Sequence, residues 1–300
     1  MKQINTSPIL NAPLKPFLSC KDHTVSQDEF SLVIDVASGL LITSPRPNDE
    51  DLGSYYESDA YISHTDSNKT IRDRVYQTVK NYAIKKKLKL INTFDFKEKT
   101  LLDIGVGTGD FISMCEKNNW NVVGVEPNQK ARNIAKKKLQ KESTKIHTNI
   151  ENLLNGTEIK PQKFDVITMW HVLEHVPNLN EYVFNLKQLL KPNGMLIIAV
   201  PNYKSYDAEY YKEFWAAYDV PRHLWHFSKT AIQKLFQQEQ MRVVQILPML
   251  FDSFYVSLLS EKYKTGKSNL LKAFYIGFQS NLKARRSKEY SSHIYIIKNS

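Results

Sequence analysis

A buried strand that ends in a glycine-rich turn is the feature that most restricts how this chain can fold. TLLDIGVG (residues 100–107) is an apolar run that closes on glycines, which predicts a strand followed by a tight turn. Helical and strand-like segments then alternate, which predicts parallel strand–helix–strand units with helices on both faces of one sheet. The carboxyl ends of such strands share one edge, where these sheets bind ligands. The alternating segments are DFISMCEKNN, NVVGVEP, NQKARNIAKKKLQKE, KIHTN, FDVITMW, LNEYVFNLKQLLKPNG and MLIIAVPN.

The loop after the first strand contains three alternating glycines, Gly105, Gly107 and Gly109. A dinucleotide-binding loop needs a small residue three positions after the second glycine, and this chain has Asp110 there. We therefore expect a cofactor that places no diphosphate at the loop. Asp103 lies just before the loop, where a carboxylate suits a ligand with an amino group. Glu126 ends the next strand, where a carboxylate can accept hydrogen bonds from both ribose hydroxyls.

WHVLEHVPN (residues 170–178) contains the order H-x-x-E-H, the spacing of one class of zinc peptidases. The preceding FDVITMW is strand-like, so His171 is expected to begin a loop and not to lie inside a long helix. Pro177 follows His175 by two residues and opposes a helix at that point. We therefore predict neither a metalloprotease nor a bound metal.

Four segments together resemble the class I S-adenosylmethionine-dependent methyltransferases over residues 100–249: LLDIGVGTGDF, VVGVEP, FDVITMWHVLEHVPN and LKPNGMLIIAVPN. The resemblance implies an α/β fold with a Rossmann-like, doubly wound sheet of seven strands whose last strand is reversed. SSHIYIIKN (residues 291–299) fits that last strand, and we expect it at an edge of the sheet. The cofactor implied by the resemblance is S-adenosylmethionine.

The resemblance also assigns residues to the cofactor. Asp103 and the three glycines of the loop would hold its methionine part, and Glu126 would hold the ribose. Trp170 and His171, after the fourth strand, would line the cofactor pocket. The family often has an acidic or amide residue after the third strand that contacts adenine, and Asn149 is the nearest candidate here.

An aromatic insert, residues 203–227, follows the fifth strand of the resemblance. Nine of its 25 residues are aromatic, against 11% for the whole chain, so it forms either an apolar wall of the acceptor pocket or simple helix-to-sheet packing. His223 is a candidate base for a hydroxyl proton, with Asp219 orienting it, and a purely structural histidine is the alternative. His171 is the second candidate catalytic histidine, and His175 is expected to be structural.

The ends of the chain form separate units in this interpretation. Residues 1–60 resemble a ribbon-like module that precedes some small-molecule methyltransferases, but Cys20 alone cannot complete its zinc site, so we expect a β module without metal. Residues 61–99 would be a linker helix or lid, and residues 100–300 the cofactor domain. Residues 251–286 look helical, with an apolar stripe that favours core packing or a homodimer contact, and a membrane surface as the alternative. The stripe consists of Leu270, Phe274, Phe278 and Leu282.

Charge and cysteine content limit the partners. The net charge of +10 is attributed mainly to solvated helix faces. Nucleic acid is disfavoured as an acceptor, because neither a [DNS]-P-P-[YF] motif after the fourth strand nor a cysteine nucleophile is present. Two cysteines, without a signal peptide or a long apolar run, favour a cytoplasmic protein.

Together these observations predict an enzyme that transfers a methyl group from S-adenosylmethionine to a small-molecule acceptor, at a hydroxyl oxygen. Two alternatives remain at this stage. One is a sensor or scaffold that binds the cofactor without turnover. The other is methylation at carbon or nitrogen of a sugar or lipid-like acceptor.

Overall fold

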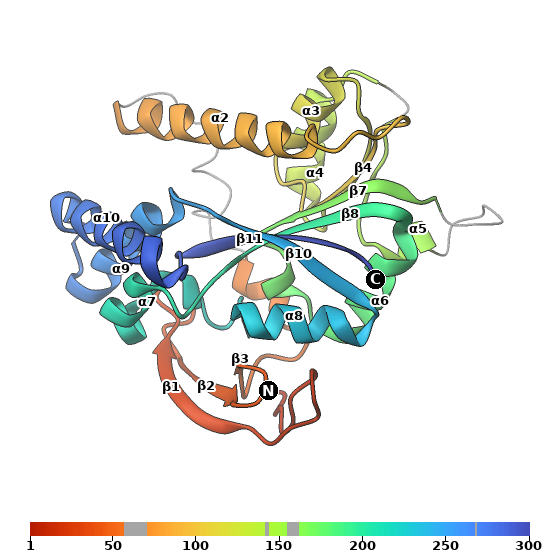
Figure 1. Ribbon diagram of the computed structural model, residues 1–300. Coiled ribbons are helices and arrows are strands. Elements are labelled where there is room, and N and C mark those ends of the chain that lie inside the picture. Colours follow the sequence, from red (N-terminus) through yellow and green to blue (C-terminus); the bar gives the residue numbers. More distant parts are fainter. Residues whose placement is uncertain (57–70, 142–143, 155–161, 268) are drawn as a thin grey trace.

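A mixed sheet of seven strands forms the centre of the molecule (Figure 1). The computed structural model describes residues 1–56, 71–141, 144–154, 162–267 and 269–300. The strand order is β10-β11-β8-β7-β4-β5-β6, which confirms the predicted seven-stranded Rossmann-like sheet. The strands are β4 (Thr100–Ile104), β5 (Asn121–Val125), β6 (Ile146–His147), β7 (Phe164–Trp170), β8 (Leu190–Pro201), β10 (Met241–Pro248) and β11 (Ser292–Asn299).

The last strand is reversed, as the resemblance implied, but it does not lie at an edge. β11 is antiparallel to both of its neighbours, β8 and β10, whereas the neighbouring pairs from β8 to β6 are parallel. The prediction of an edge strand was therefore wrong. The reason is burial: most of β11 is enclosed, including Ile297, whereas the mostly accessible strand β10 forms the edge.

Helices cover both faces of the sheet (Figure 1). In the view of Figure 1, α2, α3 and α4 lie above the sheet, and α6 and α8 lie below it. The five helices are α2 (Ile71–Ile91), α3 (Asp110–Lys117), α4 (Gln129–Lys138), α6 (Leu179–Leu189) and α8 (Lys229–Gln238), and a short helix α5 (Glu151–Leu154) follows β6. Ser228 caps α8, because its side chain accepts a hydrogen bond from the N–H of Ala231 at 3.1 Å. These layers bring the carboxyl ends of β4, β5 and β7 to one edge.

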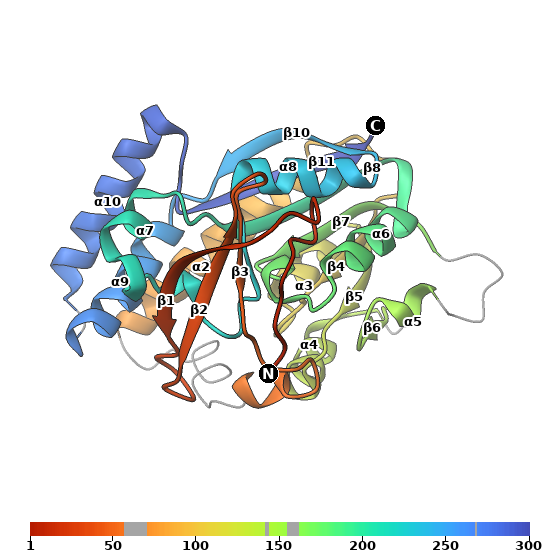
Figure 2. The same ribbon diagram turned by 90° about the horizontal axis from the view of Figure 1, so that it is seen from below.

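A second, antiparallel sheet lies below this core in the view of Figure 1 and in front of it in Figure 2. Its order is β1-β2-β3-β9, from β1 (Lys15–Lys21), β2 (Glu29–Asp35), β3 (Leu40–Thr43) and β9 (Trp225–His226). The predicted amino-terminal β module is therefore present as a small sheet. Its fourth strand comes from the aromatic insert, since Ile42 pairs with Trp225 and Leu41 with His226. No pattern in the sequence predicted this pairing between distant segments.

The aromatic insert is mostly core. After α7 (Tyr206–Tyr211) it forms two short 3₁₀ turns, Lys212–Phe214 and Ala216–Tyr218. Its large rings are buried against the amino-terminal sheet and the carboxyl-terminal helices, including those of Tyr211, Trp215 and Tyr218. Of the two interpretations of the insert, the structure therefore favours packing for these side chains.

Residues 251–286 are helical, as predicted, but the apolar stripe is not in the core. The segment forms α9 (Asp252–Thr265) and α10 (Leu270–Ser287), which pack against each other. The four residues of the stripe are all exposed: Leu270, Phe274, Phe278 and Leu282. Small residues of α10, such as Ala273 and Gly277, face α9 instead, because they allow the two backbones to approach closely. Among the helices that the structure describes, none has both the length and the apolar character needed to cross a membrane.

Asp207 fixes α7 to the elements around it. Its side chain is fully buried and accepts hydrogen bonds from Trp215 Nε1 at 2.8 Å, Ser280 Oγ at 2.6 Å and Ser291 Oγ at 2.7 Å. These donors belong to the aromatic insert, to α10 and to the segment before β11. One carboxyl group therefore joins the aromatic insert to two segments that lie 73 and 84 residues later in the chain.

We predict that Asp207→Ala lowers the free energy of unfolding by about 3 kcal/mol or more, because it leaves three buried donors without an acceptor. Chemical denaturation followed by circular dichroism measures this. Asp95→Ala, at an exposed position, is the control and should change little. A loss below about 1 kcal/mol for Asp207→Ala would show that these bonds contribute little net stability.

Candidate functional site

The glycine loop after β4 has a backbone that favours glycine at each of the three predicted positions. Gly105, Gly107 and Gly109 have φ angles of 79°, 56° and 86°, in the left-handed region. A Cβ on Gly105 would also lie 2.4 Å from Val172 Cγ2, and one on Gly109 would lie 2.8 Å from the Ala135 backbone. A Cβ on Gly107 would meet nothing within 4 Å. Two glycines therefore allow close packing, while the third leaves open space above the loop.

Glu126 follows β5 and holds the glycine loop in place. One carboxylate oxygen accepts the N–H of Gly107 at 2.8 Å, and the other accepts the N–H of Asn128 at 2.9 Å. Each oxygen can accept a further hydrogen bond, because a carboxylate offers about four lone-pair sites. Glu126 can therefore shape the loop and still receive hydroxyl groups of a ligand.

Asp103 is buried beneath the loop and accepts a hydrogen bond from Thr168 Oγ1 at 2.7 Å. Burial raises the pKa of its carboxyl to about 7, although Thr168 and the nearby Lys87 ammonium act in the opposite direction. A buried carboxyl of this kind is best compensated by a cation. The residues at this edge therefore fit the amino group of S-adenosylmethionine.

Lys87, on α2, reaches into the same region and was not predicted. Its ammonium lies 4.3 Å from the centroid of the Trp170 ring, and burial lowers its pKa to about 8 despite the charges of Asp103 and Asp252. Lys87 therefore departs from the expectation that the excess positive charge lies on solvated helix faces. A signal was available, because Ile84 and Ile91 are buried on the face of α2 that also carries position 87.

Trp170 is the last residue of β7, and His171 begins the loop that follows it, as predicted. The Trp170 ring contacts Phe111 of α3 edge-on, with centroids 5.6 Å apart. His171 has a φ of 58°, and its two ring nitrogens face two carboxylates: Nδ1 lies 3.3 Å from Glu174 Oε1, and Nε2 lies 3.0 Å from Asp252 Oδ2. Although burial opposes a charge here, the two carboxylates raise the pKa of His171 to about 10. The two carboxylates therefore favour the imidazolium form of His171 at neutral pH, and its catalytic role stays a prediction.

A second histidine cluster lies next to this loop. Donor atoms of Glu174, His175 and His223 all lie within 4.8 Å of one another. Nδ1 of His175 donates to the carbonyl of Arg222 at 3.0 Å, and Nδ1 of His223 donates to the carbonyl of Ala217 at 2.9 Å. Nε2 of His223 lies 3.9 Å from Asp219 Oδ2. Burial and the neighbouring His223 lower the pKa of His175 to about 4, which suits the structural role expected for it.

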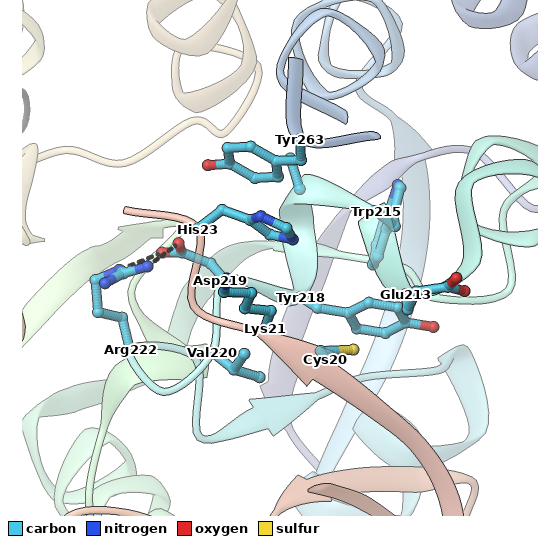
Figure 3. A pocket seen from close by; sticks show the side chains of 11 residues that line it. Cys20, Lys21, His23, Glu213, Trp215, Tyr218, Asp219, Val220, Arg222 and Tyr263 are labelled. Atoms are coloured by element: carbon cyan, nitrogen blue, oxygen red, sulfur yellow. Dashed lines mark hydrogen bonds and ion pairs between the residues drawn. The ribbon is translucent and has the colours of Figure 1, made fainter. Parts of the chain in front are cut away.

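Arg222 and Asp219 lie on the same turn, beside a very small cavity (Figure 3). The buried guanidinium donates to Asp219 Oδ1 at 2.7 Å and to Asp22 Oδ1 at 3.1 Å. The cavity, which Tyr218 and Tyr263 also line, has a volume of about 10 Å³. That is room for about one water, so it is no acceptor pocket.

The structure thus groups most of the predicted site residues at one edge of the sheet. Asp103, the glycine loop and Glu126 lie at the ends of β4 and β5, and Trp170 and His171 lie at the end of β7. His223 approaches the β7 loop from the aromatic insert. Asn149, after β6, is exposed, and its Oδ1 accepts the N–H of Asn152 at 3.1 Å. Its contact with adenine stays a prediction.

Comparison with known proteins identifies the family. A family model described as a methyltransferase domain matches residues 76–246, more than half of the chain. The chain belongs to this methyltransferase family. It is a class I S-adenosylmethionine-dependent methyltransferase, and S-adenosylmethionine is its methyl donor.

Individual relatives match over shorter stretches or with lower identity. The ubiquinone biosynthesis O-methyltransferase of Actinobacillus pleuropneumoniae serotype 7 is 34% identical over 108 residues, which cover 35% of this chain and 46% of that protein. The chain thus matches less than half the length of this relative. The fold is shared with the magnesium protoporphyrin IX methyltransferase of Synechocystis PCC 6803, solved with bound S-adenosylhomocysteine (13% identity, TM-score 0.55, covering 84% of this chain and 100% of the other). It is also shared with a cyclopropane synthase of Mycobacterium tuberculosis (13% identity, TM-score 0.53, covering 84% and 99%).

The raised pKa of Asp103 predicts that cofactor binding depends on pH. Only the ionised carboxylate attracts the amino group of the cofactor, so the affinity for S-adenosylhomocysteine should fall as the pH drops below about 7. Isothermal titration between pH 5.5 and 8.5 measures this. Asp103→Asn should bind more weakly and with little dependence on pH in this range. A wild-type affinity that is flat across this range would exclude Asp103 as the partner of the amino group.

The cluster of Glu174, His175 and His223 resembles a metal site in its geometry, and metal removal tests whether it is one. Because the imidazolium of His171 already lies against the Glu174 carboxylate, we expect no resident metal at Glu174, His175 and His223. EDTA treatment followed by desalting should leave both the melting temperature and the methyl-transfer rate unchanged. A loss restored by Zn²⁺ or Mg²⁺ would instead assign the three side chains as metal ligands.

Proposed function

We propose that this protein transfers a methyl group to a hydroxyl oxygen of a small-molecule acceptor. The observation that carries the choice of oxygen is the placement of His223 next to the loop after β7: its Nδ1 contacts the Ala217 carbonyl at 2.9 Å, and its Nε2 lies 3.9 Å from Asp219 Oδ2. A hydroxyl must lose a proton when it is methylated, so a nearby imidazole suits this acceptor. The A. pleuropneumoniae relative is a ubiquinone biosynthesis O-methyltransferase, which supports the same class of acceptor atom.

The proposed roles at the cofactor side follow from the contacts. Asp103 attracts the amino group, Glu126 binds the ribose hydroxyls, and the open space above Gly107 leaves room for the bound molecule. Before the cofactor binds, the Lys87 ammonium interacts with the Asp103 carboxylate in place of the cofactor's amino group. Because Lys87 belongs to α2, this helix covers the cofactor pocket. The cofactor, when bound, supplies an electrophilic methyl group on a sulfonium.

The chain's own residues then handle position and charge. The acceptor oxygen must lie about 3 Å from the methyl group and in line with it, so most of the rate enhancement comes from positioning. In this proposal His223 Nε2 takes the hydroxyl proton, and the Asp219 carboxylate, 3.9 Å away, stabilises the resulting imidazolium. His171, already protonated, contributes a fixed positive charge to the pocket wall and no proton transfer.

The first experiment separates an enzyme from a binding protein. S-Adenosylmethionine and S-adenosylhomocysteine are titrated calorimetrically into the wild type, Glu126→Ala and Glu126→Gln, each checked for folding by its melting temperature. Saturable binding that is lost in both variants supports the cofactor assignment. Wild-type protein is then incubated with phenolic, catecholic, sugar and lipid-like acceptors and analysed by mass shift. Binding without transfer to any of them would favour a sensor, and a product methylated at carbon or nitrogen would contradict the proposal.

Replacing His223 tests the proposed base. We predict that His223→Ala and His223→Gln lower kcat by about 10²-fold to 10⁴-fold and leave the affinity for S-adenosylhomocysteine within a factor of about 2. The residual rate should rise with pH as the acceptor hydroxyl ionises by itself. His23→Ala, in the turn between β1 and β2, is the histidine control. Unchanged transfer over the whole pH range would exclude His223 as the base.

A further inference from the structure

The outer surface of α10 is apolar over a wide arc. On a helical projection its exposed apolar side chains span about 140°. They are Leu270, Leu271, Phe274, Tyr275, Phe278 and Leu282, and two of them are 86% exposed (Leu271) and 64% exposed (Phe274). The buried face of the same helix carries small residues, such as Ala273 and Gly277. Large apolar groups thus point away from the core, which is the reverse of an ordinary amphipathic helix.

The apolar arc continues onto the start of α9. Leu250 and Phe251 are both exposed, and the Leu250 carbonyl accepts a hydrogen bond from Asn281 Nδ2 of α10 at 2.8 Å. Phe251 also contacts the exposed Tyr82 of α2, with ring centroids 5.5 Å apart. The surface therefore joins α10, the start of α9 and α2. We call these exposed side chains of α10, together with Leu250 and Phe251, the α10 face.

The charges around the α10 face are positive. Seven basic side chains of this segment are exposed: Lys262, Lys264, Lys267, Lys283, Arg285, Arg286 and Lys288. The acidic residues of α9 and α10 are already engaged, because Glu261 is buried against Lys272 at 3.1 Å and Asp252 pairs with His171 at 3.0 Å. The described residues of α9 and α10 thus offer no exposed carboxylate to balance the cations.

We propose that the α10 face docks on an anionic phospholipid membrane. Exposed Leu and Phe side chains beside Lys and Arg are the combination that places a helix in the interface of an anionic bilayer. A second copy of the chain is less suitable, because a two-fold contact through this face would bring the seven cations close to their own symmetry mates without a counter-charge. The inference concerns a surface and does not depend on the acceptor atom proposed above.

The docked orientation places the site near the lipid. Phe251 of the α10 face is followed directly by Asp252, whose carboxylate contacts His171 at the end of β7. A membrane bound to the α10 face would therefore lie next to Phe251 and Asp252, which connect this face to His171. An acceptor dissolved in the bilayer would have a short path to the sheet edge.

The test is flotation of the full-length protein with vesicles of phosphatidylcholine alone and of phosphatidylcholine mixed with phosphatidylglycerol. We expect binding to the mixed vesicles only, weakened by added salt. Leu271→Ser/Phe278→Ser should lower the partition coefficient by about tenfold or more, because it removes apolar groups from the contact. Arg285→Gln/Arg286→Gln should lower it through the lost charge.

Two matched variants control for general changes in apolarity and charge. Val36→Ser/Phe184→Ser replaces two exposed apolar residues far from α10, and Lys136→Gln/Lys137→Gln removes two exposed cations in the last turn of α4. Both should bind vesicles as the wild type does, and all variants should keep their affinity for S-adenosylhomocysteine. The proposal is overturned if wild-type protein ignores the mixed vesicles, or if the controls lose as much binding as the α10 variants. It is equally overturned if light scattering shows a dimer that the α10 variants break while vesicles bind nothing.

Discussion

The position of the segment that carries His223 depends on one buried guanidinium. Arg222 donates to Asp219 in its own turn (Figure 3). It also donates to Asp22 in the turn between β1 and β2, so it fixes the amino-terminal sheet to the aromatic insert. Its carbonyl also accepts the Nδ1–H of His175, and the next residue is His223. A buried cation needs such partners, because charge that leaves water without compensation is strongly unfavourable. The position of His223 is therefore determined by contacts with residues about 200 positions earlier in the chain.

A second set of charges connects α9 to the loop that follows β7. Because His171 lies between Glu174 and Asp252, its protonated form is favoured, and the raised pKa of about 10 makes this contact pH-dependent. For a group whose pKa is raised on folding, the stabilisation is complete below the unfolded pKa of about 6.5 and is lost as the pH rises through about 10. The ring is about one third exposed, so solvent weakens the effect. Across the neutral range, the loop therefore stays attached to α9.

The sequence predicted the features that depend on local pattern. The glycines, Asp103 and Glu126 follow from the spacing around two buried strands, and the structure brings them together because parallel strands end at a common edge. The features it did not predict involve partners distant in sequence. Strand β9 exists only because Trp225 meets Ile42, and β11 is an inner strand only because β10 covers it. Lys87 was missed for a related reason: its charge suggested solvent, whereas its position on α2 faces the buried Asp103.

The apolar stripe of α10 shows a more general limit of periodicity. A period near four identifies one face of a helix but does not say whether that face meets the core or the outside. Residue size on the opposite face is more informative here. A Cβ added to Gly277 would lie 2.9 Å from Phe254 Cα, so α9 approaches α10 along a face where only small side chains fit. Because α9 occupies that face, the large side chains of Leu271 and Phe278 cannot be buried between the two helices. The large side chains of α10 therefore lie on the surface, next to the segment that holds His171.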